Sequence, residues 1–163
     1  MNIPNLRPAR EDEFDFAFEA KRQAMGPHIM AKWGWNEELQ LAHHKSRWEE
    51  KPWSIIVVDN TAIGTVSLDW RAEYLQFGEF YIFDAYRAQG FGTRVIQATL
   101  VEADRRRIET RLEYLKWNPV ASLYLRHGFR VVGENDIHFF AVRAVTGQRP
   151  NNSFKPTPLR GAA

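Results

Sequence analysis

Hydrophobic positions along this chain follow two different periods. Phe14, Ala17, Phe18 and Met25 recur at the spacing that places side chains on one face of a helix. The run Trp53–Val58 is short and rich in β-branched residues, which is typical of a strand. Because both patterns occur in one chain, the sequence predicts a fold that mixes helices and strands.

The first part of the chain predicts one strand and two helices. A short strand covers Ile3–Arg7, and acidic residues in the turn that follows favour a helix start. Gly26-Pro27 is expected to end this first helix, with His28–Gly34 as a connection. Asn36 is a good N-cap for a second helix that runs to about Trp48.

Strands dominate the rest of the chain. After Trp53–Val58, the turn Asp59-Asn60 leads into a returning strand over Ala62–Trp70. A third strand, Tyr74–Phe83, runs directly into a glycine-rich turn. The elements after that turn are a helix containing Val95, Ile96, Leu100 and Ala103, a strand over Arg111–Trp117, a helix from Pro119 to Gly128, and a hairpin of Arg130–Gly133 and Ile137–Arg143. This order predicts one mixed sheet covered by helices.

Composition narrows the class of protein. A chain of 163 residues is the size of one domain. The absence of cysteine excludes disulfides, thiolate zinc sites and a cysteine nucleophile. No apolar run is long enough to span a bilayer, and the first residues lack a signal-peptide pattern. We therefore expect a soluble, cytoplasmic protein without a membrane partner.

Charge argues against a nucleic-acid partner. The chain has 22 basic and 20 acidic residues, and two of the basic ones, Lys155 and Arg160, lie in the segment Asn151–Ala163, which has no acids. The body is therefore neutral, whereas binding to a phosphate backbone requires a basic surface.

The turn Arg87–Thr93 is the main candidate for chemistry. Its two glycines lie between a predicted strand and a predicted helix, where free backbone amides and the helix dipole favour a phosphate group. An ordinary tight turn would also explain two glycines. A Walker loop and a dinucleotide fingerprint both require residues that are missing here.

Two blocks of the sequence resemble a known family. Arg87-x-x-Gly90-x-Gly92 is similar to the acetyl-coenzyme A signature of the GNAT N-acetyltransferases, although Asp84 stands where many members have proline. Asn118, Ala121, Leu123-Tyr124 and Gly128-Phe129 resemble a second block of that family, with one residue fewer before Leu123.

The resemblance implies a fold, a cofactor and the residues that hold it. We expect a GNAT-like α/β (α+β) fold: a mixed, largely antiparallel sheet of about six to seven strands, with four helices packed on both faces. Residues 1–147 would form the acetyltransferase domain, and residues 148–163 a polar tail that is similar to translated integron cassette sequence. Acetyl-coenzyme A would be held by Ile82, Arg87, Gln89, Gly90, Phe91, Gly92, Thr93 and Asn118.

Tyr124 and Glu79 are the expected catalytic residues. Tyr124 stands where family members keep the tyrosine that protonates the leaving thiolate, and a core tyrosine is the alternative. Glu79 lies on the strand that enters the glycine turn, where several members keep a catalytic glutamate. A bulge there would change which face the side chain occupies. A solvent-facing glutamate, with ordered water as the base, is the alternative.

The acceptor is expected to bind near the first two helices. Aromatic rings beside carboxylates suit a cationic amine, so Trp33, Trp35, Glu37 and Tyr81 are the candidate substrate residues, although tryptophans that only anchor the helices would look the same. His43-His44 matches no metal site and is expected to be a solvated pair, so we expect no metal.

Three functions remain open at this stage. The first is transfer of an acetyl group to a primary amine of a small molecule, by direct attack in a ternary complex. Modification of proteins or peptides is the second, and a non-catalytic acyl-coenzyme A binding module on the same fold is the third. The sequence leaves open whether the chain forms a homodimer.

Overall fold

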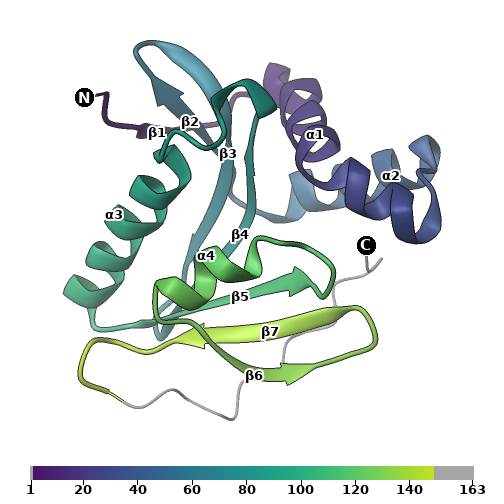
Figure 1. Cartoon of the computed structure of the whole chain (residues 1–163). Helices are drawn as coiled ribbons and strands as arrows, with labels where there is room; N and C mark the ends of the chain where they lie inside the picture. The colour runs from purple at the N-terminus through teal and green to yellow at the C-terminus, as the bar shows by residue number, and fades with distance from the viewer. Residues whose placement is uncertain (1, 149–163) are drawn as a thin grey trace. The chain divides into compact units, whose positions relative to one another are not determined.

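The computed structural model describes residues 2–148, so the predicted tail from residue 149 onward lies outside the described residues (Figure 1). The chain forms two compact units. The first unit contains the chain up to Asp69 together with Gly78–Val95. The second contains Trp70–Phe77 and residues 96–148.

The first unit begins with a short strand and two helices, and α1 and α2 lie side by side (Figure 1). Antiparallel pairing joins β1 to β2 and β2 to β3. Its core contains Ile55, Ile56, Ile63 and Val66, none of them exposed. The elements are β1 (Asn5–Pro8), a 3-10 turn η1 (Glu11–Glu13), α1 (Phe14–Trp33), α2 (Glu37–Glu50), β2 (Ser54–Val58) and β3 (Thr61–Trp70), followed by the second half of β4 (Tyr74–Ile82), the 3-10 turn η2 (Asp84–Tyr86) and the start of α3 (Phe91–Arg106).

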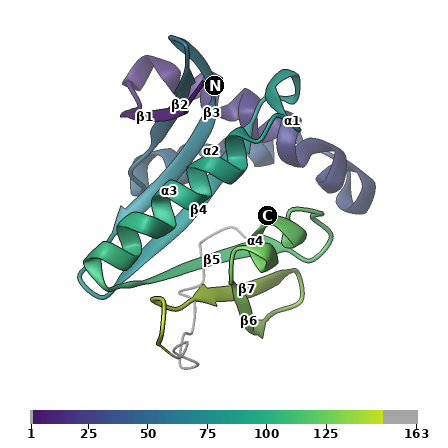
Figure 2. The same ribbon diagram turned by 60° about the vertical axis from the view of Figure 1, so that its left-hand side comes forward.

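The second unit contains the other half of β4, most of α3 and a four-element C-terminal part. The start of β4 pairs in parallel with β5, whereas β5 and β6 each pair antiparallel with β7. Figures 1 and 2 both show α4 beside β5. The C-terminal elements are β5 (Glu109–Leu115), α4 (Ala121–Arg126), β6 (Arg130–Glu134) and β7 (His138–Arg143).

The strand order is β1-β2-β3-β4-β5-β7-β6. Within residues 2–148 this gives a mixed, largely antiparallel sheet of seven strands, accompanied by four α-helices. The α/β fold class predicted from the sequence is therefore confirmed. No helix in this part of the chain is both long and apolar enough to cross a membrane.

The prediction that Gly26-Pro27 ends the first helix is wrong. Helix α1 continues through Pro27 to Trp33, and the expected connection His28–Gly34 is helical except at its end. Burial of Ile29, which is 2% exposed, favours the extra turns despite the backbone hydrogen bond that Pro27 removes. The helix ends at Gly34, whose φ of 76° stops the ladder.

Other boundaries move by small amounts. Strand β5 begins at Glu109 rather than Arg111, and α4 begins at Ala121 rather than Pro119. The side-chain oxygen of Asn118 accepts a hydrogen bond from Val120 N at 3.0 Å. This local turn occupies the position where the sequence predicts the first helical residue.

Candidate active site

The glycine turn lies between β4 and α3, as predicted. Gly90 has a φ of 82°, in the region that glycine adopts without strain. The hydrogen bond from Arg94 N to Gly90 O, 3.1 Å long, begins the backbone ladder of α3. The amides of Phe91, Gly92 and Thr93 precede that ladder and point along the positive end of the helix dipole.

The residues of this turn fit a pyrophosphate group. A Cβ at Gly90 would meet nothing within 4 Å, so the backbone there is open to a ligand. Successive amides at a helix N-terminus are donors that suit phosphate oxygens. At Gly92, a Cβ would lie 3.4 Å from the side chains of Ile82 and Phe80, so this glycine lets α3 pack closely on β4.

The polar side chains of the turn hold its backbone in place. Arg87 donates from Nε to Ile82 O at 2.8 Å and forms an ion pair of 2.5 Å with Asp84. Gln89 donates from Nε2 to Ala85 O at 3.0 Å. Asp84, at the position where many GNAT sequences have proline, therefore has a partner within the loop. In this structure Arg87 and Gln89 contact the loop itself.

Strand β4 bulges at Glu79, which has a φ of 46°. Here β4 lies very close to β3, because a Cβ at Gly64 would stand 2.1 Å from Tyr81 O. Thr65 adds a hydrogen bond from Oγ1 to Glu79 O at 2.9 Å. The sequence analysis did not identify Gly64. An isolated glycine inside a strand pattern is the signal that indicates such a close approach.

The Glu79 carboxylate is surrounded by cations, and its side chain is only 5% exposed. Lys51 Nζ lies 3.1 Å from Oε1, and Arg47 Nε lies 3.4 Å from the same oxygen. The Tyr81 hydroxyl donates to Oε2 at 3.1 Å. We call Lys21, Arg47, Lys51, Glu79 and Tyr81 the Glu79 cluster.

Charge within the Glu79 cluster fixes the state of the carboxyl. Burial alone raises the pKa of Glu79, but the fields of Lys51, Arg47 and Lys21 outweigh burial and hold that pKa at about 2. Glu79 is therefore ionised at neutral pH. The sequence-based alternative of a solvent-facing glutamate is wrong, because the side chain is buried and pairs with Arg47 and Lys51.

Lys21 is the most deeply buried cation of the cluster, at 3% exposure. Its Nζ has no hydrogen-bond partner among the described residues. Burial, followed by repulsion from Arg47, lowers the pKa of Lys21 to about 8. Lys21, Arg47 and Lys51 were not predicted as site residues. For Lys21 a signal was present, because it stands four positions after Ala17 and four before Met25, on the apolar face of the predicted helix.

His44 lies in an aromatic core and is not solvated, so the prediction of a solvated histidine pair is wrong for this residue. Its ring is unexposed, and ring centroids of Phe14 and Phe18 lie 4.6 and 5.3 Å away. Nε2 donates to Phe14 O at 3.1 Å, since a carbonyl can only accept. Burial lowers the pKa of His44, so the ring is neutral at physiological pH.

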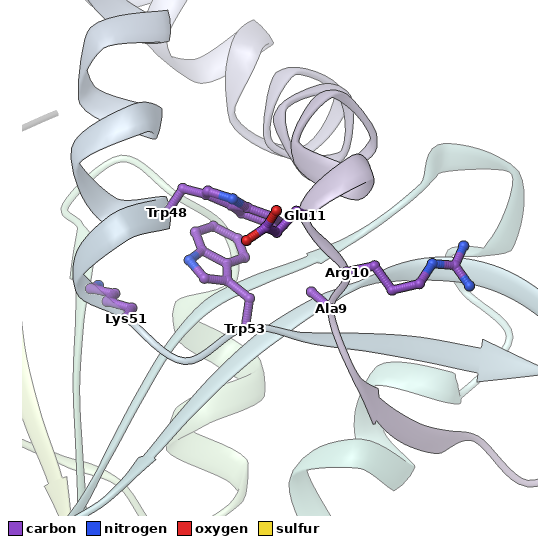
Figure 3. A pocket seen from close by; sticks show the side chains of 6 residues that line it. All are labelled: Ala9, Arg10, Glu11, Trp48, Lys51 and Trp53. Atoms are coloured by element: carbon purple, nitrogen blue, oxygen red, sulfur yellow. The ribbon is translucent and has the colours of Figure 1, made fainter.

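A small surface pocket opens beside this core. Its volume is about 150 Å³, and the rings of Trp48 and Trp53 lie side by side in it, with centroids 5.3 Å apart (Figure 3). Lys51 lines one side of the pocket, so the lysine that contacts Glu79 is also reached from solvent. The lining residues are Ala9, Arg10, Glu11, Trp48, Lys51 and Trp53.

Two of the residues predicted to bind a cationic acceptor, Trp35 and Glu37, contact a cation of the chain itself. The Glu37 carboxylate accepts from Trp35 Nε1 at 2.7 Å and pairs with Arg22 at 2.5 Å. The Arg22 guanidinium also lies 5.8 Å from the centroid of the Trp35 ring. Trp33 is 46% exposed. Of the four predicted substrate residues, the structure places Tyr81 beside Glu79.

Tyr124 lies in the second unit, within an aromatic group. Its ring centroid is 5.7 Å from those of Tyr114 and Phe129 and 6.3 Å from that of Phe77. We call these four residues the Tyr124 cluster. Burial, with a smaller contribution from Tyr114, raises the pKa of the Tyr124 phenol far above its ordinary value. The hydroxyl therefore keeps its proton at any physiological pH.

Comparison with known proteins agrees with this architecture. The family model for the GNAT acetyltransferase domain matches residues 51–131, which include the β4 bulge and the glycine turn. A comparison of the sequence with curated proteins finds no significant match.

Solved structures with the same fold are acetyltransferases of low sequence identity. PaiA N-acetyltransferase from Thermoplasma acidophilum, solved with coenzyme A, is 18% identical at a TM-score of 0.65, over 86% of this chain and 98% of that one. An acetyltransferase from Thermus thermophilus is 13% identical at a TM-score of 0.67, over 88% and 99%. The ribosomal-protein-S18-alanine N-acetyltransferase of Escherichia coli is 13% identical at a TM-score of 0.65, over 93% and 100%.

Sequence and structure thus agree on the glycine turn between β4 and α3 and on the fold that carries it. Residues 51–131 match the GNAT domain of acetyl-coenzyme A-dependent acetyltransferases.

Proposed function

We propose that this protein transfers an acetyl group to the primary amine of a small molecule, by direct attack in a ternary complex. The enclosure of the Glu79 cluster is the observation that carries the proposal. Glu79 and Lys21 are 8% and 3% exposed, and the cations of the cluster come from α1, α2 and the residue that follows α2. Buried polar groups fit a small polar ligand, whereas an extended peptide requires an open strip of surface.

Residues of the chain would bind and orient the cofactor. Bound acetyl-coenzyme A supplies the activated acetyl thioester. The amides of Phe91, Gly92 and Thr93 bind and orient the pyrophosphate, and residues 1–147 form the domain that provides this scaffold. Asn118 supports the second motif through its turn contact with Val120.

Glu79 would attract the acceptor ammonium without removing its proton directly. A carboxylate with a pKa of about 2 is a weak base, and efficient general bases have pKa values near the working pH. The ammonium proton therefore leaves through ordered water beside the ionised carboxylate. Tyr81 holds Oε2 of that carboxylate in one orientation.

Tyr124 would act at the other end of the reaction. Its phenol holds a proton at Oη because burial opposes ionisation. That proton would pass to the departing sulfur as negative charge develops there, and the proton released by the acceptor ammonium would restore the phenol.

A thiol-release screen with acetyl-coenzyme A tests this proposal. The panel would contain small amines, aminoglycosides, amino acids and short peptides, and the small-molecule acceptors are expected to give a higher kcat/KM than the peptides. Calorimetry should show one acetyl-coenzyme A site per chain. Cofactor binding without release by any acceptor would favour the non-catalytic module, whereas turnover restricted to peptides would favour a protein acetyltransferase.

A further inference from the structure

The Glu79 cluster has more positive than negative charge. Lys21 from α1 and Arg47 and Lys51 from α2 all act on the single carboxylate of Glu79. The charges that act on the Lys21 ammonium are likewise two cations, Arg47 and Lys51, and one anion, Glu79. Like charges brought together in a buried site repel strongly, because little water separates them.

The cluster also contains unused hydrogen-bonding capacity. An ammonium has three donors, and Lys21 Nζ has no hydrogen-bond partner among the described residues, although it is buried. A buried charge without compensation is costly, and natural structures rarely retain one unless it has a role. Arg47 and Lys51 are partly open, with side chains 13% and 17% exposed. An incoming group can therefore reach this side of the cluster.

We propose that the Glu79 cluster recognises a carboxylate on the acceptor, so that the substrate is an amino acid or a close amino-acid analogue. This inference rests on the proposed function and names the substrate class of the same site. The acceptor carboxylate would face Arg47 and Lys51, with Lys21 adding positive charge from behind. The acceptor ammonium would face Glu79, which lies within 3.4 Å of both contact cations.

The charge pattern of an amino acid matches this arrangement, and that of a simple cationic amine does not. In an amino acid the ammonium and the carboxylate are a few ångströms apart, as Glu79 and its two cations are. An amine without an anionic group would bring a fourth positive charge to a single carboxylate. The alternative cation site, Trp35 and Glu37, already binds Arg22.

Matched acceptors provide the test. The thiol-release assay would compare amino acids with the corresponding amino acid amides, which retain the amine and side chain but lack the carboxylate. We expect the wild-type enzyme to prefer the acids by at least about tenfold in kcat/KM, since a lost charge contact in an enclosed site commonly costs this much. Lys51→Met should remove most of that preference through KM, and Lys51→Arg should restore it.

A matched control separates this effect from a general change in charge. Lys45 lies on the same helix, and its side chain is exposed. Lys45→Met removes one cation from α2 without touching the cluster, so it should leave the preference for acids unchanged. Equal use of acids and amides by the wild type, or retention of the preference in Lys51→Met, would overturn the proposal.

A binding measurement separates failure of the inference from failure of the proposed function. If amines without a carboxylate turn over and amino acids do not, the acetyltransferase proposal stands and the carboxylate site is wrong. If no acceptor releases thiol, the melting temperature of the coenzyme A-bound protein shows whether amino acids bind. Amino acids, but not their amides, should then raise the melting temperature of the coenzyme A-bound wild type and not that of Lys51→Met. Equal shifts would overturn the inference.

Proton uptake gives an independent readout. A carboxylate beside Lys21 would raise the pKa of this lysine from about 8, so binding near pH 8 should take up protons. Calorimetry of amino acid binding in buffers of different ionisation enthalpy measures this uptake. Amino acid amides should show none, and uptake that is the same for acids and amides would count against the site.

Discussion

Two buried residue groups, one in each unit, are stabilised in opposite ways. In the first unit, the Glu79 cluster consists of charged side chains held in one place by ion pairs of 3.1 and 3.4 Å. In the second unit, the Tyr124 cluster consists of rings that pack edge-on or tilted against one another. Tyr124 is 6% exposed and Glu79 is 8% exposed, so both reactive groups are almost equally buried.

The same degree of burial has opposite effects on the two groups. Around Tyr124 the neighbours are uncharged, so burial raises the pKa and preserves the proton. Around Glu79 three cations overcome burial and preserve the negative charge. Burial therefore sets how strongly the neighbours act, and the charge of those neighbours decides which form is stable.

Removal of the Tyr124 hydroxyl should have the largest effect on activity. Tyr124→Phe keeps the three ring contacts, so the free energy of unfolding should change by no more than about 1 kcal/mol. Loss of a proton donor should lower kcat by about 10² to 10⁴ with little change in coenzyme A affinity. Steady-state thiol release, calorimetry and urea unfolding measure these quantities. An unchanged kcat would assign the tyrosine to packing alone.

Neutralisation of Glu79 should mainly lower stability. Glu79→Gln leaves Lys21, Arg47 and Lys51 without their shared carboxylate, which should cost about 3 kcal/mol in the free energy of unfolding. Glu49→Gln, an exposed change on α2, is the control. Adding Lys21→Met to Glu79→Gln should recover part of the loss, because it removes one buried charge. Additive effects of the two changes in urea unfolding would contradict this coupling.

Acid should lower the free energy of unfolding through the Glu79 cluster. The folded pKa of Glu79 lies near 2, below its ordinary value of 4.5, so its stabilising contribution is present above pH 4.5 and is lost as pH falls through the folded pKa. A shift of this size corresponds to about 3 kcal/mol. His44 acts in the same direction. Its folded pKa lies below 6.5, so the stability that the neutral ring contributes is lost as pH falls from 6.5 through the folded pKa.

Comparison of variants isolates the contribution of Glu79 to this acid sensitivity. Below pH 4.5 the free energy of unfolding should fall more steeply in the wild type than in Glu79→Gln, and Tyr124→Phe should follow the wild type. Parallel pH profiles for wild type and Glu79→Gln would show that the carboxylate is not stabilised by the cluster.

Changes in the glycine turn should have the smallest effects, because in the proposed function its ligand contacts come from the backbone. Gly90→Ala places a Cβ on a residue with φ of 82°, which should cost about 1 kcal/mol of stability. That Cβ enters the open space at the turn, so coenzyme A affinity should also fall. In Gly92→Ala the new Cβ points toward Ile82 and Phe80 instead, so this change should affect packing more than coenzyme A affinity. Calorimetry and urea unfolding of both variants provide the test.

Local patterns were sufficient to predict most of the secondary structure and the position of the glycine turn. The turn between β4 and α3 depends on residues that are adjacent in the chain, and glycine is needed there for its positive φ. The first helix was predicted too short because Pro27 is a strong local signal for an end. Burial of Ile29 by residues distant in sequence was not visible in that signal.

The sequence by itself determined the mixed fold, the strand, glycine turn and helix unit, and the identity of Tyr124 and Glu79 as candidates, since each depends on short-range periodicity or motif. Only the tertiary structure decided the environment of those candidates. Lys21, Arg47 and Lys51 stand 28 to 58 positions before Glu79 in the chain, and packing of α1 and α2 over the β4 bulge brings their charges together. Electrostatic energy depends on distance in space, so the ionised state of Glu79 and the carboxylate preference that we infer have no signature in the linear sequence.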